Sequence, residues 1–287
     1  MSDRGRITVE AYTEKATELF ALPETALRLQ ELLNDDRSSL SDVADVVSID
    51  PNLTTMLLKV ANSAFYNFPS SIDTVSRAIN VIGSEAVFNL ALASSAVDCF
   101  QNTPKNVIDL ELFWRHSVDT ALICKELGQQ IRSKNKERLF VIGLLHNLGE
   151  LVCATETPDL AQACAQDNPT IPPWTRQKNT LGFTYAELSM ALLKAWKLPP
   201  EIYNTVGNQH TPEQSSFPVE TGLLYLSTRL ALSLSVEQHF EEEDRLTLEL
   251  ANRLGLSSEH IQEAIEYANL EAINILSILN PLAGAIF

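Results

Sequence analysis

Apolar residues recur every three to four positions along most of the chain, which is the period of an amphipathic α-helix. Period-two runs of β-branched residues are hard to find, and glycine is scarce, at 10 of 287 residues. One apolar stripe covers residues 53–61 behind the helix-starting pair Asp50-Pro51, and a second covers 75–82 and stops at Gly83. The pattern therefore predicts an all-α protein of about a dozen helices.

The later part of the chain continues this pattern. Ser84 is predicted to cap an apolar, central helix, and a long helix is predicted after Asp109. Further helices are predicted over 137–148, ending at Gly149, over 219–239 and over 259–279. Thr184 and Glu187 have capping-box spacing and predict a helix that runs through Trp196. The polar segments 101–106 and 167–180 are predicted to be surface connections, because they carry Pro and Asn between the apolar stripes.

Charge narrows the classes of partner. The 37 acidic residues outnumber the 21 basic ones, for a net charge of −16, which argues against general nucleic-acid binding and against docking on an anionic membrane. Half of that excess lies in residues 237–271, which hold ten acids and two bases. The four cysteines form no CxxC pair and predict buried, reduced thiols. No signal segment opens the sequence, so a cytoplasmic location is expected.

Three histidines invite a chemical interpretation. His116 follows Trp-Arg on the long predicted helix, His146 follows a run of apolar residues, and His210 ends a short helix. Taken singly, each is more typical of a hydrogen-bonded interior or helix-end histidine than of a ligand. The simpler interpretation is that His116 and His146 hydrogen-bond across the interface of two lobes and hold helices in register.

A series of short motifs gives the arrangement a more specific meaning. In chain order they are LPE (22–24), IDPNL (49–53), VANSAFY (60–66), SRAI (76–79), VIG (81–83), FWRH (113–116), GLLH (143–146) and WKLP (196–199). In order and spacing, this series resembles the HDOD family, non-catalytic relatives of the HD metal-dependent phosphohydrolases. The resemblance implies a two-lobed, all-helical HDOD domain over 19–236, divided into an N-terminal lobe 19–103 and a degenerate HD-like lobe 104–236. Residues 237–287 are then an acidic extension of extra C-terminal helices.

The resemblance also implies which residues stand at the metal-binding positions of the HD enzymes. His116 and His146 match the two histidines, whereas Asn147 stands in place of the paired aspartate and Thr228 in place of the final one. Two neutral imidazoles and an amide provide no negative charge for a hard dication, which prefers carboxylate oxygen.

Two histidines seen in relatives are also replaced, by Tyr185 and Gln209, although His210 remains. No catalytic residue and no metal ligand are therefore expected. The expected degenerate pocket consists of His116, His146, Asn147, His210 and Thr228.

The expected function is that of a bacterial signal-transduction module that binds a protein partner, with no nucleic acid, no membrane and no cofactor. Homodimerisation through the C-terminal helices is a further expectation. Two alternatives stay open: a phosphohydrolase that recruits Glu150 or Glu187, and a sensor that binds a nucleotide or an anion beside Arg115 and His146. A weak transition-metal site on His116, His146 and His210 is a third.

Overall fold

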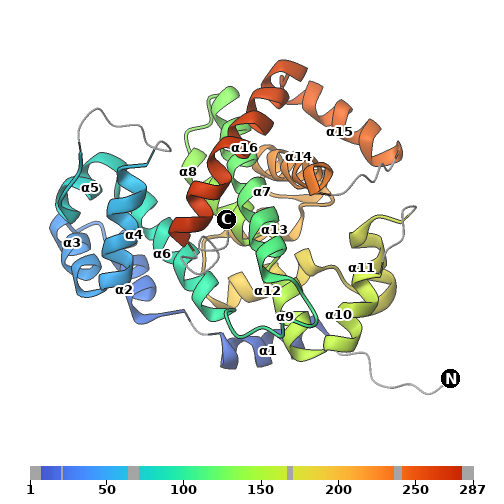
Figure 1. The fold of residues 1–287 in the computed structure, drawn as a ribbon, viewed down its shortest axis with the longest axis horizontal. Coiled ribbons are helices and arrows are strands. Elements are labelled where there is room, and N and C mark those ends of the chain that lie inside the picture. Colours follow the sequence, from blue (N-terminus) through green and yellow to red (C-terminus); the bar gives the residue numbers. More distant parts are fainter. Residues whose placement is uncertain (1–7, 21, 64–70, 167–170, 236–240, 280–287) are drawn as a thin grey trace. The chain divides into compact units, whose positions relative to one another are not determined.

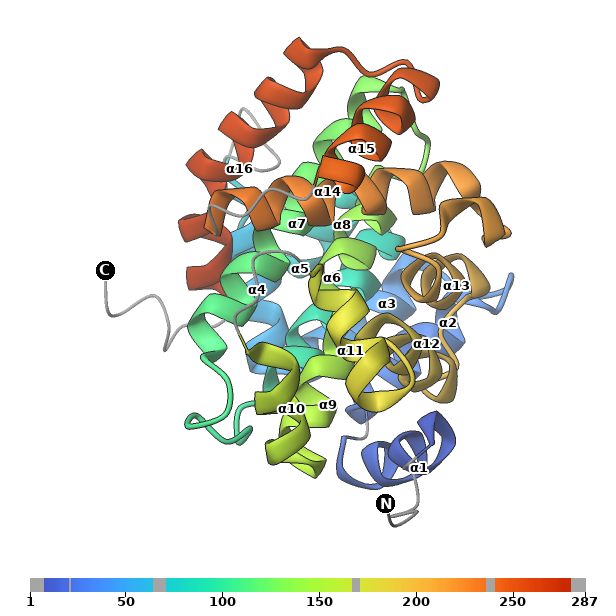
Figure 2. The same cartoon turned by 90° about the vertical axis from the view of Figure 1, so that its right-hand side faces the viewer.

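The computed structural model describes residues 8–20, 22–63, 71–166, 171–235 and 241–279, and in these ranges every regular element is a helix (Figure 1, Figure 2). The all-α prediction is confirmed. The chain divides into two compact units, each made of two separate pieces of sequence. Unit 1 comprises residues 1–21 and 102–268, and unit 2 comprises 22–101 and 269–287. The sequence-based division at 103/104 and 236/237 stays a prediction.

Unit 1 holds the three predicted histidines. Its elements are α1 (Val9–Leu19), α7 (Leu110–Gln130), α8 (Lys136–Leu145), α9 (Leu148–Glu156), α10 (Pro158–Ala165), α11 (Pro173–Leu181), α12 (Tyr185–Ala195), α13 (Pro200–Gly207), the 3-10 turn η1 (Pro212–Gln214), α14 (Pro218–Ser235), α15 (Glu241–Arg253) and the first half of α16 (Ser258–Leu279). Helix α7 is the core of the unit, because its residues from Ser117 to Cys124 are all buried.

Two glycines allow the helices around the histidines to approach each other closely. A Cβ atom added at Gly143 of α8 would lie 2.5 Å from Cα of Ala121 on α7. One added at Gly149 of α9 would lie 2.2 Å from the carbonyl oxygen of Tyr185 on α12. The Gly149 amide also donates to Oγ of Ser189 at 2.8 Å. Backbone packing at these points fixes α8 against α7 and α9 against α12. His146 lies between α8 and α9, so both sides of its position are held.

Unit 2 consists of α2 (Glu24–Leu33), α3 (Leu40–Ile49), α4 (Pro51–Ala61), α5 (Val75–Ile82), α6 (Ser84–Cys99) and the second half of α16. Helix α6 is buried on nearly all sides, as the sequence predicts. Asn62 ends α4 and joins it to the chain before α5. Its Oδ1 accepts from the Ile72 amide at 2.8 Å, and its Nδ2 donates to the Ile72 carbonyl at 2.7 Å. Asn62 is the C-cap of α4, and its side chain adds a bridge from this cap to Ile72.

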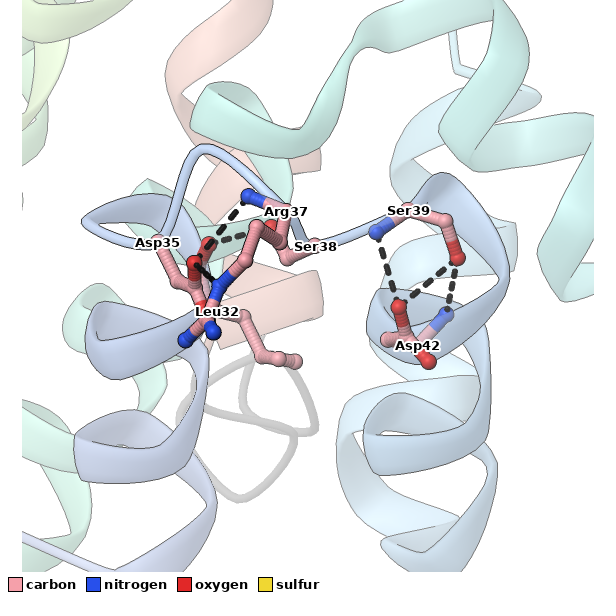
Figure 3. Close-up of polar contacts among 6 residues, drawn as sticks. All are labelled: Leu32, Asp35, Arg37, Ser38, Ser39 and Asp42. Atoms are coloured by element: carbon pink, nitrogen blue, oxygen red, sulfur yellow. Dashed lines mark hydrogen bonds and ion pairs between the residues drawn. The ribbon is translucent and has the colours of Figure 1, made fainter.

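The turn between α2 and α3 is held by local polar contacts (Figure 3). The Asp35 carboxylate accepts from the backbone amide and the guanidinium of Arg37, each at 3.0 Å. Ser39 and Asp42 form a reciprocal capping box at the start of α3. The capping box satisfies backbone donors that the start of α3 leaves without partners, whereas the Asp35 carboxylate holds the turn before it.

Three predicted elements differ from the structure. The predicted helix 137–148 is in fact two helices, because α8 ends at Leu145 and α9 begins at Leu148, so that Gly149 lies inside a helix. Gly83, with φ +88°, is the N-cap of α6, and Ser84 is its first helical residue. The predicted connection 167–180 contains α11, because Pro173 is a favourable first residue of a helix and Gly182 ends it in the left-handed conformation.

Among the described residues, one helical stretch, 136–156, is long and apolar enough to cross a membrane, and 78% of its apolar window is buried inside the fold. The bent pair α5–α6 passes the same composition test only if it is counted as one span. A mostly buried stretch of this kind is typical of the core helix of a folded domain.

Candidate functional site

A pocket of about 240 Å³ lies within unit 1 and contains all five residues of the expected degenerate site. Its lining is His116, His146, Asn147, Glu150, Cys164, Ala165, Pro173, Trp174, Arg176, Gln177, Tyr185, Gln209, His210, Thr228 and Leu232. These side chains come from α7, the α8–α9 junction, α10, α11, α12, the end of α13 and α14. Five sequence positions spread over more than 100 residues are thus brought to one cavity, while their roles stay predictions.

His116 projects from α7 and donates a hydrogen bond to the carbonyl of Ala231 on α14. Its Nδ1 atom is buried and has no hydrogen-bond partner. Burial lowers the pKa of His116 to about 4, against the opposing effect of the Ala231 carbonyl. The ring is therefore neutral at physiological pH, and it joins α7 to α14 within a single unit rather than across two lobes.

His146 follows the last residue of α8, and its ring meets that of His116 edge-on, with centroids 5.5 Å apart. Nδ1 lies 2.7 Å from the Gly143 carbonyl oxygen, and because a carbonyl only accepts, Nδ1 carries the proton. Burial, with the neighbouring His116, lowers the pKa of His146 to about 3. Gln209 donates to the His146 carbonyl at 2.9 Å, so this residue stabilises the turn between α8 and α9.

Asn147 is predicted to stand in place of the paired aspartate of the HD enzymes, and its side chain already forms a hydrogen bond. Its Nδ2 atom donates to Oε2 of Glu150, one turn further along α9. Burial raises the pKa of Glu150 to about 7, although the hydrogen bond from Asn147 acts in the opposite direction. The carboxyl group that lies nearest in sequence to the degenerate position is thus a poor anion at neutral pH, because its surroundings favour the protonated form.

His210 is held by a stack of aromatic and cationic groups. Its ring lies 4.8 Å from that of Trp174, nearly parallel to it. The Arg229 guanidinium carbon lies 4.2 Å from the Trp174 ring centroid and 3.5 Å from that of Tyr225. Arg229 also contacts Nδ1 of His210 at 3.5 Å, and burial together with this cation lowers the pKa of His210 well below its usual value.

Thr228 is predicted to stand in place of the final aspartate of the HD enzymes, and it lines the pocket. Its hydroxyl donates to the Tyr225 carbonyl at 3.0 Å and accepts from Nη1 of Arg229 at 3.1 Å. The side chain is therefore neutral, buried and adjacent to a fixed positive charge. A divalent metal placed at this corner would be repelled by the guanidinium instead of being attracted by a carboxylate.

The donor set does not fit the metal that the HD enzymes bind. Within the described ranges, no group of three or more His, Cys, Asp and Glu side chains is arranged to hold a metal ion. This geometry also does not favour a transition metal held by His116, His146 and His210. Cys164 lines the pocket, but burial raises the pKa of its thiol, which disfavours a nucleophilic thiolate.

The structure adds residues that the sequence did not single out. Trp174, Arg176 and Gln177 enter the pocket from α11, a segment interpreted as a connection because its Pro, Asn and Gln residues mask the helical period. Pro173, at the first helical position, is the sequence feature that indicates this helix. Arg115, by contrast, does not line the pocket. It forms an ion pair with the buried Asp119 at 2.9 Å, one turn along α7.

The fold defines the class as all-helical and HD-like, and the assignment of Asn147 and Thr228 to its two acidic metal positions stays a prediction. The HDOD domain family matches residues 19–212, which is more than half of the chain, so the chain belongs to the HDOD family.

The solved structures that resemble the chain agree with this fold. A "Putative phosphohydrolase" of Shewanella amazonensis SB2B has a TM-score of 0.73 at 23% identity and covers 95% of this chain and 98% of its own. An "HDOD domain protein with unknown function" of Geobacter sulfurreducens has a TM-score of 0.72 at 21% identity, with the same coverage. A "Putative signal transduction protein" of Marinobacter aquaeolei VT8 has a TM-score of 0.71 at 25% identity and covers 93% of this chain and 60% of its own.

One curated relative, an "Uncharacterized protein" of Treponema pallidum (strain Nichols), is 28% identical over 197 residues. The match covers 66% of this chain and 37% of the relative, so the chain spans little more than a third of that protein's length.

Proposed function

We propose that this chain is a bacterial signal-transduction module that acts through protein–protein contacts and does not hydrolyse phosphoesters. The observation that carries the proposal is the state of the two acidic metal positions. Asn147 is neutral and bonded to Glu150, and Thr228 is neutral and bonded to Arg229. Metal-assisted hydrolysis needs anionic ligands to hold the dication that activates water.

The similarity to a protein named for signal transduction supports a regulatory role, and the HDOD family is a relative of the HD phosphohydrolases without being defined by their activity. The first alternative, a phosphohydrolase with recruited carboxylates, has a weak structural basis. Glu150 favours its protonated form, and Glu187 is occupied by the capping box of α12 and by Lys178, whose Nζ lies 2.8 Å from Oε1.

The second alternative, a sensor of a small ligand or nucleotide, is favoured by one observation. The pocket combines an indole, Trp174, with the amides Asn147, Gln177 and Gln209, and such a mixture of an aromatic face with a few polar groups is typical of ligand sites. A thermal-shift screen with nucleotides and small anions tests it, because a ligand at 100 times its Kd stabilises the folded state by about 2.7 kcal/mol.

The experiment that tests the main proposal is an activity assay of the full chain. The protein is incubated with Mg²⁺, Mn²⁺ or Zn²⁺ and with phosphomonoesters or cyclic dinucleotides, and no turnover is expected. Metal-dependent turnover that is abolished by His146→Ala would overturn the proposal. Turnover that persists in His146→Ala indicates a contaminating enzyme. The cytoplasmic location and the homodimer stay predictions.

A further inference from the structure

In the pocket lined by His116, His146 and His210, which we name the histidine pocket, three buried side chains each have one polar atom without a hydrogen-bond partner. These side chains are His146, Gln177 and Gln209, which keep 3%, 8% and 2% of their surface exposed. The other polar atom of each group is bonded to the backbone, and within the described ranges no partner is found for the remaining one. Buried polar groups are nearly always hydrogen-bonded, so three such atoms at one cavity indicate a ligand.

His146 and Gln209 contribute acceptors to the pocket. Nδ1 of His146 donates to the Gly143 carbonyl, so Nε2 of the neutral ring carries a lone pair and no proton. Nε2 of Gln209 donates to the carbonyls of His146 and Val206, at 2.9 and 3.1 Å, which fixes the amide and turns Oε1 away from them. Neither Nε2 of His146 nor Oε1 of Gln209 is fully enclosed by protein, so both acceptors reach the cavity that these side chains line.

Gln177 contributes a donor from α11. Its Oε1 accepts from the backbone amide of Tyr185 at 2.9 Å, which leaves Nε2 with two protons to donate. This Nε2 atom is not fully enclosed by protein either. The pocket therefore presents two neutral acceptors, from the α8–α9 junction and the end of α13, and one neutral donor from α11. The aromatic rings of Trp174 and Tyr185 line the same cavity.

The hydrogen-bonding capacity of these three atoms selects the chemistry of the ligand. A phosphate dianion or a carboxylate accepts hydrogen bonds but donates none, so it cannot satisfy the acceptors of His146 and Gln209. A hard dication is not favoured either, because both acceptors are neutral. A flat, uncharged ring with N–H groups and a carbonyl satisfies all three atoms and can pack against aromatic side chains. At about 240 Å³ the pocket is smaller than the roughly 300–1,000 Å³ of sites for drug-sized ligands, which favours a single ring system over a dinucleotide.

We infer that the histidine pocket binds a small, uncharged nitrogen heterocycle of the nucleobase type. Its N–H groups donate to Nε2 of His146 and Oε1 of Gln209, and its carbonyl accepts from Nε2 of Gln177. The inference goes beyond the proposed protein contact, and it names the ligand class for the sensor alternative on which it rests. Such a ligand connects α11 with α13 and with the α8–α9 junction, so its binding stabilises these elements together.

The test measures binding of uracil and of hypoxanthine to the full chain by isothermal titration calorimetry. Both rings carry N–H donors and a carbonyl, and at least one of them should bind with a Kd between about 1 μM and 1 mM, the range that ligands of this size reach at good efficiency. The fully N-methylated form of each ring keeps the carbonyl but has no N–H group, so it should bind at least about tenfold more weakly. Inorganic phosphate, which Arg176 of the lining could attract, should not compete, and a metal chelator should not change the affinity.

A matched pair of variants locates the ligand in the pocket. His146→Asn keeps a side-chain amide that can donate to the Gly143 carbonyl but removes Nε2, and it should weaken binding of the ring about tenfold. His260→Asn makes the same change on α16, at a histidine that does not line the pocket, and it should change the affinity by less than about twofold. Circular dichroism verifies that both variants are folded. The comparison of the two ring forms uses the unchanged chain, so it decides the inference even if His146→Asn does not fold.

Absence of binding by both rings would overturn the inference, as would equal affinity for the parent and the methylated ring or an equal effect of the two histidine substitutions. Displacement of the ring by phosphate, or loss of binding with the chelator, would also overturn it, because the pocket would then hold an anion or a metal. Failure here leaves the proposed absence of hydrolysis intact, whereas metal-dependent turnover of a phosphoester would remove that proposal without changing the binding of the ring.

Discussion

The buried carboxyl group of Glu150 provides a quantitative test of the site. Burial raises its pKa from 4.5 to about 7. The folded protein therefore binds a proton over a pH range in which the unfolded chain has released it, so the free energy of unfolding falls as the pH rises through this range. A difference of about 2.5 pKa units corresponds to about 3 kcal/mol of stability, present below pH 4.5 and lost above about pH 7.

Glu150→Gln removes this dependence, because glutamine is neutral at every pH and keeps an acceptor for Asn147. Urea unfolding followed by tryptophan fluorescence measures the effect, and Trp114, Trp174 and Trp196 all lie in unit 1. The free energy of unfolding of the variant, taken relative to that of the wild type, should be about 3 kcal/mol higher at about pH 8 than at about pH 4.5.

The buried histidines act in the opposite direction and make the comparison between variants necessary. Their pKa values are lowered, so the stability that they contribute is lost as the pH falls below 6.5. The difference between wild type and Glu150→Gln cancels that common part. Glu111→Gln, on the exposed start of α7, is the matched control for the loss of one carboxyl group. A Glu150→Gln difference that is constant from about pH 4.5 to about pH 8 would refute the assignment of a buried, proton-binding carboxyl.

Three further predictions concern packing, metal binding and unit 2. Gly143→Ala places a Cβ atom against the backbone of α7 and should lower the free energy of unfolding by about 2 kcal/mol or more, which lowers the Tm of unit 1 by roughly 4–8 °C. Gly222→Ala is the control, because its Cβ atom meets only flexible leucine side chains, and it should change the Tm little. Asn147→Asp/Thr228→Asp restores both carboxylates and should bind Mn²⁺ more tightly than the wild type by calorimetry; equal affinity would contradict the argument from missing charge. Asn62→Ala should destabilise α4 and α5 by about 1–3 kcal/mol, visible as faster amide hydrogen exchange there, and unchanged exchange would show that the bridge to Ile72 is dispensable.

The sequence predicted the fold class well, because helical periodicity and caps are local signals. The capping box of Thr184 and Glu187, for example, is present at the start of α12. The sequence pattern does not indicate the break between α8 and α9, because a glycine such as Gly149 usually ends a helix. The glycine at this position instead serves tertiary packing, because it allows the Tyr185 carbonyl of α12 to approach α9.

The site was only partly predictable for the same reason. The motifs FWRH and GLLH indicated His116 on α7 and His146 after α8, and the family resemblance indicated Thr228 on α14. The stack of Arg229 on Trp174 and Tyr225 joins residues from two helices that are far apart in the sequence, and no local sequence pattern predicts such a contact. The pairing of Arg115 with Asp119 likewise depends on burial of the carboxylate, which removed the expected anion-binding group from the pocket.

The division into two units has a topological consequence. The chain passes from unit 1 to unit 2 after residue 21, returns after residue 101, and leaves again after residue 268. Neither unit can therefore be excised by a single cut. The family match over 19–212 begins in the first piece of unit 1, ends inside its second piece, and stops before the second piece of unit 2. A fragment limited to that match would lack α14 and α16, and hence the wall that carries Thr228 and Arg229. The piece of sequence by which the family is recognised is shorter than the piece that must fold together.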